Sequence, residues 1–500
     1  MLSSHMKHRT GSVYICAILA LLILTSLSIS LIGQASMNHQ MSTNQADVVA
    51  ARMAAESGME YMIMQVSDIV FEADTTDSNV MDRLKTSLSV ALDSDGQAGA
   101  LSLSQDKSRL AINPRSLDVG VFYCSFQQVD DPDDSTKEIV MSVTGSSNGV
   151  SRDISMRLDL TDRSSNVFGY GFASKGKIEI GGSATIEEIN DPKGMKMLST
   201  LDSAPAIAAG GSADIKGSLY LTGESEDFLS LKGGGYEIAG ESSEKVIREK
   251  YVHLGTEIDY FPEVDTSPFV TIATNYASSL NMGDYSDENV DYVDDTGKKA
   301  KGSAKNVGTL VNMTVEPNEN PKFNNATIKG VLCIKYPNEV HFHGKTTIEG
   351  VIVTEQGPSD SGSDKKKGKG KDKGSPIIVF HGQTSAKDPS GLDATDTAYT
   401  EVRKHTGTVI LAPGFDLQFR GNTNAISGTI AADSIEFRGN SGTEADPQGI
   451  NGVILGLDPG GVSKLGGSSH VKMNLSNNND KPAGFKLKQQ LVFDPNSYSE

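Results

Sequence analysis

The chain has 500 residues, more than one ordinary domain holds, so two or three domains are expected. Its 64 acidic residues outnumber its 45 lysines and arginines, which gives a net charge of −19. Binding to nucleic acid depends on a positive surface, so this charge argues against nucleic acid as a partner. The 51 glycines, the lack of tryptophan and a hydrophobic content of 37% favour many short strands over a large helical core.

A long apolar run lies close to the N-terminus. It extends from Val13 to Ile32 without a charge, about 20 residues, which is the length a helix needs to cross the core of a bilayer. Lys7 and Arg9 precede the run, and the first charge after it is Asp47. The positive-inside rule therefore predicts a single-pass membrane protein whose N-terminus is cytoplasmic and whose body is periplasmic or on the cell surface.

Two interpretations of this run stay open. Small residues at Gly33 and Ala35 fit a cleaved secretory signal. The chain continues, however, with apolar residues spaced mostly by three, four or seven, which predicts one apolar face of a helix. These residues are Met37, Met41, Val48, Ala55, Met59, Met62, Val66 and Ile69. We therefore expect a transmembrane helix over 12–35 that continues as an amphipathic stem over 36–72.

The N-terminal motifs follow one another in a recognisable order. A short basic leader ends in glycine, "KHRTG", an apolar helix comes directly after it, and the stem carries "AARMAAESGMEYM". This arrangement resembles the N-terminus of type IV pilin-like proteins, above all the PilX-type minor pilins, and is similar to the K-type pseudopilins of type II secretion. The resemblance implies a leader over 1–11 that a prepilin peptidase removes by cutting between Gly11 and Ser12. It also implies the inner membrane and other pilin-like subunits as partners.

One position departs from the pattern of major pilins, which carry a glutamate at the fifth mature position. Here that position is Cys16. The PilX-type and K-type proteins often lack this acid as well. The resemblance therefore implies a minor or priming subunit.

Residues 73–165 are expected to form a small α/β head. The segment "NVMDRLKTSLSVAL" predicts a helix, and three alternating segments follow over 117–129, 137–146 and 150–160. They are separated by the turn-forming sequences "DDPDDST" and "SNG", which predicts an antiparallel meander. A helical stem followed by such a meander resembles the head of pilin-like proteins.

Two short phrases recur from about residue 166 onward. "NATIKGVLCI" and "KTTIEGVIVT" align on Gly330 and Gly350. A second phrase appears as "VHFHGKT", "IVFHGQT", "LQFRGNT" and "IEFRGNS", each with a central phenylalanine. Repeats of roughly 20 residues that mix short strands with glycine turns predict a parallel β-solenoid.

The expected fold class is therefore α+β, with a large all-β domain over 166–495 that forms a right-handed parallel β-helix. Phe419 over Phe437 and Ile328 over Ile348 would form ladders in its interior. A β-sandwich is the alternative. Two insertions are expected, near 240–320 and 357–376. The second is a lysine-rich, low-complexity segment that predicts a solvated loop, with a polyanion ligand as the alternative interpretation.

The three cysteines, Cys16, Cys124 and Cys333, lie far apart in the sequence. We expect two buried free thiols at the latter two positions, and a disulfide between them stays open. No C-x-x-C motif or Cys/His zinc spacing occurs, so the cysteines do not predict a structural metal.

An extracytoplasmic β-solenoid raises the hypothesis of a polysaccharide lyase or hydrolase. Such an enzyme needs clustered carboxylates, or an arginine with a carboxylate, on neighbouring coils. The candidates are Asp416, Arg420, Asp433, Glu436 and Arg438. Arg420 and Arg438 are expected to stack one coil apart on the outer face, where such ladders are usually solvated and paired with acids. We expect no enzymatic activity and assign no catalytic residue.

Histidines recur in the same phrases. His341 and His343 lie two residues apart on one strand, hence on one face, and His381 occupies the position of His343 in the next phrase. Three imidazoles suit a metal ion. Arginine holds the equivalent position in the other two phrases, so a polar outward position explains His343 and His381 more simply. We expect neither a metal nor a cofactor.

These features predict a PilX-type minor pilus or pseudopilus subunit that displays a β-helix for assembly or adhesion, with a cell-surface molecule or polysaccharide as ligand. Two alternatives stay open. One is a permanently anchored structural surface protein unrelated to pili. The other is a β-helix polysaccharide lyase or hydrolase.

Overall fold

The computed structural model describes residues 10–94, 101–117, 120–130, 137–191, 193–275, 292–293, 299–300, 306–355, 376–438, 449–475 and 481–500. The chain divides into two compact units. The helix–sheet unit comprises Met1–Arg163 and Lys488–Glu500, and the solenoid unit comprises Ser164–Leu487. In the order of the chain, the solenoid unit is an insertion into the helix–sheet unit.

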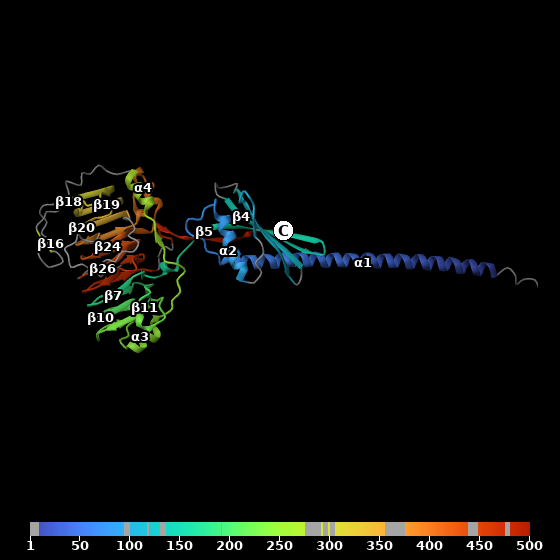
Figure 1. Ribbon diagram of the computed structural model, residues 1–500, viewed down its shortest axis with the longest axis horizontal. Coiled ribbons are helices and arrows are strands. Elements are labelled where there is room, and N and C mark those ends of the chain that lie inside the picture. The colour runs from blue at the N-terminus through green and yellow to red at the C-terminus, as the bar shows by residue number, and fades with distance from the viewer. Residues whose placement is uncertain are drawn as a thin grey trace, which may run out of the picture. The chain divides into compact units, whose positions relative to one another are not determined.

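Helix α1, Thr10–Ser67, is one continuous helix of 58 residues (Figure 1). Between Val13 and Ile32 its large apolar side chains are 53–76% exposed. Within the described part of the chain, α1 is the one helix that is long and apolar enough to cross a membrane. The prediction that the stem continues to residue 72 is wrong, because α1 ends at Ser67 and Phe71 instead forms a β-bridge with Gln489.

The helix–sheet unit contains a six-stranded sheet in the order β1-β2-β3-β4-β5-β32, and each neighbouring pair is antiparallel. The strands are β1 Leu101–Leu103, β2 Arg109–Leu117, β3 Gly120–Asp130, β4 Lys137–Ser147, β5 Val150–Arg163 and β32 Lys488–Ser499. Helix α2, Val80–Ser94, packs with the sheet and α1 around one apolar core. The predicted helix near residue 80 and the predicted meander β3-β4-β5 are confirmed, whereas β1, β2 and β32 were not predicted.

The second part of α1 approaches the sheet closely because its contact residues are small. Ala51, Ala54 and Ala55 are fully buried. A Cβ atom on Gly145 of β4 would lie 2.1 Å from the carbonyl oxygen of Ala51, and one on Gly58 would lie 2.6 Å from the ring of Phe122. The motif "AARMAAESG" is thus the place where the helix backbone meets the sheet.

The apolar face predicted for the stem is confirmed in its second half. Met59, Met62 and Val66 are buried in the core of the helix–sheet unit. Met37 and Met41 also lie on α1, where they are 61% and 70% exposed. The sheet covers only the later turns of α1.

Strand β32 adds the C-terminus of the chain to the sheet. It pairs with β5, from Lys488 opposite Arg163 to Ser499 opposite Ser155. Arg52 of α1 forms an ion pair of 2.6 Å with the side chain of Glu500. The predicted end of the solenoid at residue 495 is therefore wrong: the solenoid ends at 487, because the apolar residues of β32 complete the core beside β5.

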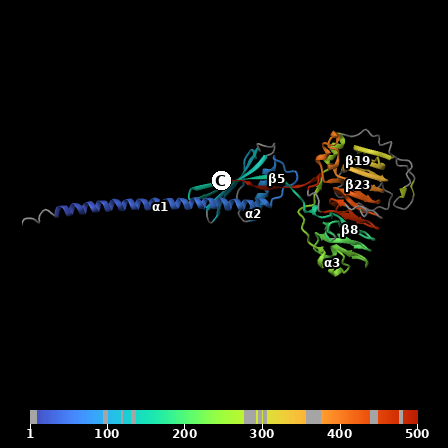
Figure 2. The ribbon, with the colours of Figure 1, turned by 180° about the vertical axis from the view of Figure 1, so that it is seen from behind.

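The solenoid unit is a stack of coils whose strands pair in parallel (Figure 2). Its first strands are β6 Phe172–Ser174, β7 Lys177–Ile180, β8 Thr185–Glu188, β9 Met195–Ser199, β10 Ile207–Gly210, β11 Asp214–Leu221, β12 Leu229–Lys232, β13 Glu237–Ile238 and β14 Val252–His253. The later strands are β18 Asn306–Val315, β19 Lys322–Lys335, β20 Glu339–His343, β21 Lys345–Glu355, β22 Ile377–Phe380, β23 Gln383–Lys387, β24 Thr408–Phe419, β25 Thr423–Ser427, β26 Thr429–Phe437, β27 Ile450–Asn451, β28 Ile454–Gly456, β29 Val462–Leu465 and β30 His470–Met473.

Smaller elements accompany the coils. The helices are α3 Glu244–Lys250 and α4 Ser267–Asn275, with 3-10 turns at Asn166–Gly169, Glu226–Phe228, Pro389–Gly391, Thr397–Tyr399 and Val402–Lys404. The two-stranded pairs are β15 Glu263–Val264 with β31 Phe485–Lys486, and β16 Tyr292–Val293 with β17 Lys299–Ala300. The insertion predicted near 240–320 contains α3 and α4, and the one predicted at 357–376 lies outside the described residues except for its last position.

Both predicted ladders are confirmed. Phe419 pairs with Phe437, with ring centroids 4.9 Å apart, and Ile328 pairs with Ile348. All four side chains are buried. The parallel register between coils contradicts the β-sandwich alternative, whose sheets are antiparallel. The right-handed sense of the coil stays a prediction.

The coils are not stacked in the order of the chain. The last coil, β28–β30, pairs with the first, β6–β8. The chain therefore enters the middle of the stack and builds outward to β14. It resumes at the opposite end with β18 and returns to the middle, so the red C-terminal strands lie beside the teal first strands in Figure 2.

One face of the coils is covered on its outer side. Val331, Cys333 and Val351 point away from the interior and are nevertheless buried, since they pack with Phe269 of α4 and with Tyr399. Among the described residues, the other two faces of the coils lack this cover. One carries β20, β22 and β29, and the other carries β23, β25 and β30. Along these strands half-exposed residues lie among the buried ones. We refer to these two as the open faces of the solenoid unit.

Replacing Gly145 with valine tests the contact between α1 and the sheet. We expect the free energy of unfolding of the helix–sheet unit to fall by about 1–3 kcal/mol or more, because no side chain fits between the two backbones. This free energy is measured by denaturant-induced unfolding, with hydrogen exchange of α1 and β4 as the readout. The control Ser151→Ala, at an exposed site on β5, should change the stability by less than about 0.5 kcal/mol. Equal stability of the two variants would contradict the close contact.

Two neighbouring residues of β32 test the assignment of the C-terminus. Leu491 is 3% exposed and Val492 is 41% exposed. Leu491→Ala should destabilise the helix–sheet unit by about 2–5 kcal/mol, whereas Val492→Ala should cost less than about 1 kcal/mol. Hydrogen exchange of β5 peptides under denaturant gives the readout. If only the solenoid unit responded, the C-terminal strand would belong there instead.

Candidate functional site

The predicted processing site lies at the start of α1. Gly11 and Ser12 fall within the first turns of the helix, directly before its exposed apolar segment. Cys16, the fifth residue after the predicted cut, is exposed on that segment. The cleavage itself stays a prediction, and residues 1–9 of the leader lie outside the described residues.

The apolar segment of α1 is itself a candidate interaction surface. Large apolar side chains are exposed all round the helix from Val13 to Ile32. A helix that is apolar on every side has to be surrounded by lipid or by other protein. The segment is therefore suited to a bilayer or to apolar surfaces of other proteins.

Cys124 and Cys333 are buried free thiols in different units, which confirms the prediction of free thiols. Burial raises the pKa of Cys333 to about 12 and the pKa of Cys124 well above its ordinary value. Both thiols stay protonated near neutral pH and are unsuited to nucleophilic chemistry.

The residues considered for catalysis lie on two neighbouring coils. Asp416 accepts a hydrogen bond of 2.5 Å from Ser434, and Asp433 accepts one of 2.8 Å from the backbone N–H of Gly414. Arg438 and Glu436 form an ion pair of 2.5 Å. These carboxylates thus have local structural partners.

The two arginines occupy equivalent positions on adjacent coils, as predicted. Each follows a phenylalanine of the interior ladder, and the backbone N–H of Arg438 donates to the carbonyl of Phe419. The guanidinium of Arg420 donates to Gln418 at 2.6 and 3.0 Å. The expectation that the chain is not an enzyme stays a prediction.

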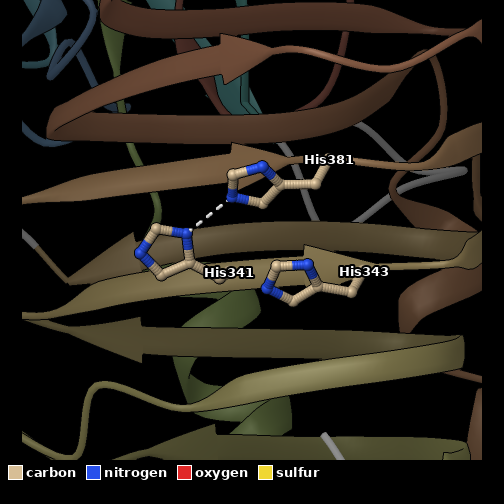
Figure 3. Close-up of side chains that lie close together, drawn as sticks. All are labelled: His341, His343 and His381. Carbon is tan, nitrogen blue, oxygen red and sulfur yellow. Dashed lines mark hydrogen bonds between the residues drawn. The ribbon is translucent and has the colours of Figure 1, made fainter. Parts of the chain in front are cut away.

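The structure brings the three histidines together on an open face (Figure 3). His341 and His343 lie on β20, and His381 follows β22, which pairs with β20. The rings of His343 and His381 stack with centroids 4.5 Å apart and an interplanar angle of 2°. Nδ1 of His341 lies 2.9 Å from Nε2 of His381. The structure fits the predicted outward orientation and the predicted common face of His341 and His343.

Burial changes the protonation of this cluster. It lowers the pKa of His343 to about 4 and that of His381 to about 3, with smaller contributions from neighbouring imidazoles and cations. Glu339 accepts a hydrogen bond of 2.8 Å from Nε2 of His341, which lowers the pKa of that carboxyl. His343 and His381 are therefore neutral near pH 7.

A groove of about 490 Å³ lies on the same open face, farther along the stack. It is bordered by Lys177, Lys232 and Lys464 together with Glu179 and Glu436. Lys177 and Lys464 both form ion pairs with Glu179, at 2.7 and 3.2 Å. Glycine pairs that lack side chains form part of its wall.

The sequence contains a signal for this groove that a search for phenylalanine-centred phrases misses. "IEIGGS", "IAAGGS" and "SKLGGS" place an aliphatic residue or alanine where the other phrases place phenylalanine. The register confirms the equivalence, because Phe437 pairs with Leu465, Leu465 with Ile180, and Ile180 with Ala209. A search for the glycine turn rather than the aromatic residue would have found these coils.

No protein-family model and no curated protein sequence matches the chain. Among solved structures, the competence-associated pilin ComZ from Thermus thermophilus is similar with 11% identity and a TM-score of 0.24, over 91% of this chain and 97% of that one. The ice-binding protein of the Antarctic ascomycete Antarctomyces psychrotrophicus has 13% identity and a TM-score of 0.23, over 61% and 95%. A domain of an ice-binding protein from Shewanella frigidimarina has 13% identity and a TM-score of 0.18, over 62% and 95%. Values this low do not decide the function of this chain.

Proposed function

We propose that the chain is a pilin-like surface subunit of the PilX-type minor class, anchored by α1 and displaying the solenoid unit outside the cytoplasm. One observation supports this most directly. A single uninterrupted helix has an exposed apolar first part and a second part seated on an antiparallel sheet. This is the arrangement that the N-terminal sequence motifs imply for a pilin-like protein.

The free energy of the apolar segment determines where it can reside. Each large apolar side chain left in water forgoes about 1.5–3 kcal/mol, so the segment as a whole forgoes on the order of 20 kcal/mol or more. A bilayer removes that cost before assembly. Neighbouring pilin-like helices can remove it afterwards, and the helix can then leave the membrane without exposing its side chains to water.

The orientation follows from charge. Lys7 and Arg9 hold the leader on the cytoplasmic side of the inner membrane, where a prepilin peptidase can cut between Gly11 and Ser12. The apolar helix then remains in the mature chain. Because Cys16 offers no negative charge at the fifth mature position, we assign the subunit to initiation or capping of a pilus or secretion pseudopilus.

The insertion of the solenoid unit between β5 and β32 supports a display role. Both ends of the insertion are joined to adjacent, paired strands of one sheet. Folding of the helix–sheet unit therefore fixes the two points from which the solenoid unit starts and ends. In this arrangement the membrane and assembly functions belong to one unit and adhesion to the other.

The groove lined by Lys177, Lys232 and Lys464 is our candidate for the adhesion site. Its three ammonium groups suit an acidic polysaccharide of the cell surface, and its glycine walls allow a sugar chain to approach the backbone. The remaining surface of an acidic chain repels such a ligand, so binding would be confined to this groove.

Two other functions make different predictions. A permanent anchor unrelated to pili would keep Met1 as its N-terminus in cells that contain an active prepilin peptidase. A polysaccharide lyase or hydrolase would depolymerise acidic polysaccharides and lose that activity in Asp416→Ala or Arg420→Ala.

Substitution of the residue before the predicted cut tests the pilin assignment. Co-expressed with a prepilin peptidase, the natural chain should begin at Ser12, and Gly11→Leu should retain the leader because the peptidase site no longer accepts the side chain. Intact mass and N-terminal sequencing of the membrane fraction give the readout. Gly33→Ala serves as the control and should be processed normally. The assignment would be refuted if Gly11→Leu and Gly33→Ala were cleaved at the same residue, or if neither of them were cleaved.

Charge removal in the groove tests adhesion. Lys464→Ser should weaken binding of an acidic polysaccharide such as polygalacturonate several-fold and make it less dependent on salt, since one ammonium contact is lost. Lys472→Ser, on the other open face, is the matched control. Equilibrium binding of the full chain in detergent measures both. Equal affinities for the two variants would place the ligand elsewhere.

A further inference from the structure

We propose that His341, His343 and His381 form a binding site for a divalent transition-metal ion that prefers imidazole ligands, with Zn²⁺ as the ion of reference. This inference is independent of the pilin-like assignment. It concerns the solenoid unit alone and rests on the position of three side chains and one carboxylate.

The geometry of the coil directs the three rings to one point. Residues two apart on a strand share a face, which places His341 and His343 side by side. Phe342 pairs with Phe380, so His343 and His381 occupy the same position on adjacent strands. Figure 3 shows each ring with a nitrogen directed toward the space between them.

The distances suit a shared ion. One ligand nitrogen from each of the three rings can be chosen so that all three atoms lie within 4.8 Å of one another. Three nitrogens bound to one tetrahedral zinc ion at about 2.0–2.1 Å are about 3.4 Å apart. The proposal requires rotations about the side-chain bonds of these residues to close the difference.

Glu339 supplies the support that metal-binding histidines usually have. Its carboxylate lies 2.8 Å from Nε2 of His341. With the proton on Nε2 donated to the carboxylate, Nδ1 of His341 carries a lone pair and faces the cluster. Such carboxylate–histidine pairs orient the ring and strengthen it as a ligand.

The surroundings leave one coordination position open. His341 is 9% exposed, and the rings lie on the opposite side of the strands from the interior pair Phe342 and Phe380. The other two imidazoles are half-buried on the outer face, so a fourth ligand, either water or a carboxylate of a bound molecule, can approach from solvent. Three histidines with one open position is a common zinc arrangement.

The fold does not require histidine at these positions. Neighbouring coils carry other residues in the same outward columns. They are Lys322, Asn324, Val379, Gln418 and Arg420. The chain has nine histidines, and three of them meet here. Stacking alone does not account for this concentration, because the columns accept aliphatic, amide and cationic side chains equally well.

A bound ion would join two coils that hydrogen bonds and interior packing already connect. His341 and His343 belong to the coil of β20, and His381 belongs to the coil of β22. The ion would therefore stabilise the stack locally, and its effect should be confined to these strands.

The neighbouring coils supply the variants for the test. His343→Asn and His341→Gln introduce residues that the same columns carry in Asn324 and Gln418, so folding should be preserved. His253→Ala, at an exposed histidine outside the cluster, is the control. The full chain, purified in detergent without a polyhistidine tag and treated with chelator, is titrated with Zn²⁺ by calorimetry. We expect the natural chain and the control to bind one more zinc ion than the cluster variants, or to bind it roughly 100-fold more tightly.

Hydrogen exchange of the natural chain gives a test that needs no variant. Zn²⁺ should slow exchange in peptides covering β20 and β22 and leave those of β7 and β10 unchanged. The proposal is overturned if zinc alters neither strand, or if the natural chain and both cluster variants bind zinc with equal stoichiometry and affinity. A cluster variant that unfolds is replaced by His381→Arg, which matches Arg420 of the next coil.

Discussion

Helix α1 has to satisfy two different surroundings with one uninterrupted backbone. Its first part needs lipid or apolar neighbours, and its second part needs a sheet. The contact with the sheet is possible because alanine and glycine let the helix axis approach β4, where Gly145 meets the backbone of Ala51. If the helix were held farther from the sheet, Met59 and Met62 would lose their core partners, and the apolar segment would no longer be rigidly attached to a folded body.

The edge of that sheet determines how the rest of the chain is built. Strand β5 leads into the solenoid unit, and β32 returns from it and pairs with β5. The same principle recurs inside the solenoid unit, where the last coil closes against the first. In both units, segments far apart in the sequence complete a sheet that local segments begin. Such long-range pairing fixes the two ends of each insertion.

Local periodicity predicted the parts of the fold that depend on local sequence. The long helix follows from its apolar spacing, the meander from turn residues between alternating segments, and the ladder of Phe419 and Phe437 from the recurrence of one phrase. Strand β32 and the order of the coils could not be derived in this way, because their pairing partners lie hundreds of residues away and a repeated phrase does not say which of its copies are adjacent. Periodicity also placed Met37 and Met41 on the helix, but it could not show that the sheet does not extend to them.

The candidate sites differ in the same way: some depend on local sequence and others on long-range pairing. The predicted processing site and the two arginines come from short motifs, which depend only on the chain near them. The sequence placed His343 and His381 at one position of a repeat and His341 on the same face as His343, yet the distance between His341 and His381 depends on which coils are adjacent. The lysine groove depends on coils from both parts of the stack, β7 and β29, which only the closed order brings together.

The surroundings of the first part of α1 test the central claim most directly. In a Cys16→Ser background, a nitroxide label is attached at Leu22 or at Met41, both exposed on the same helix, and the chain is reconstituted into lipid vesicles. The buried thiols Cys124 and Cys333 should not react with the label. The account predicts that the label at Leu22 collides with oxygen dissolved in lipid and is protected from a water-soluble nickel chelate, whereas the label at Met41 is accessible to the chelate. Equal access of the chelate to both labels, or a secreted form that lacks Leu22 and begins near Ser36, would contradict it.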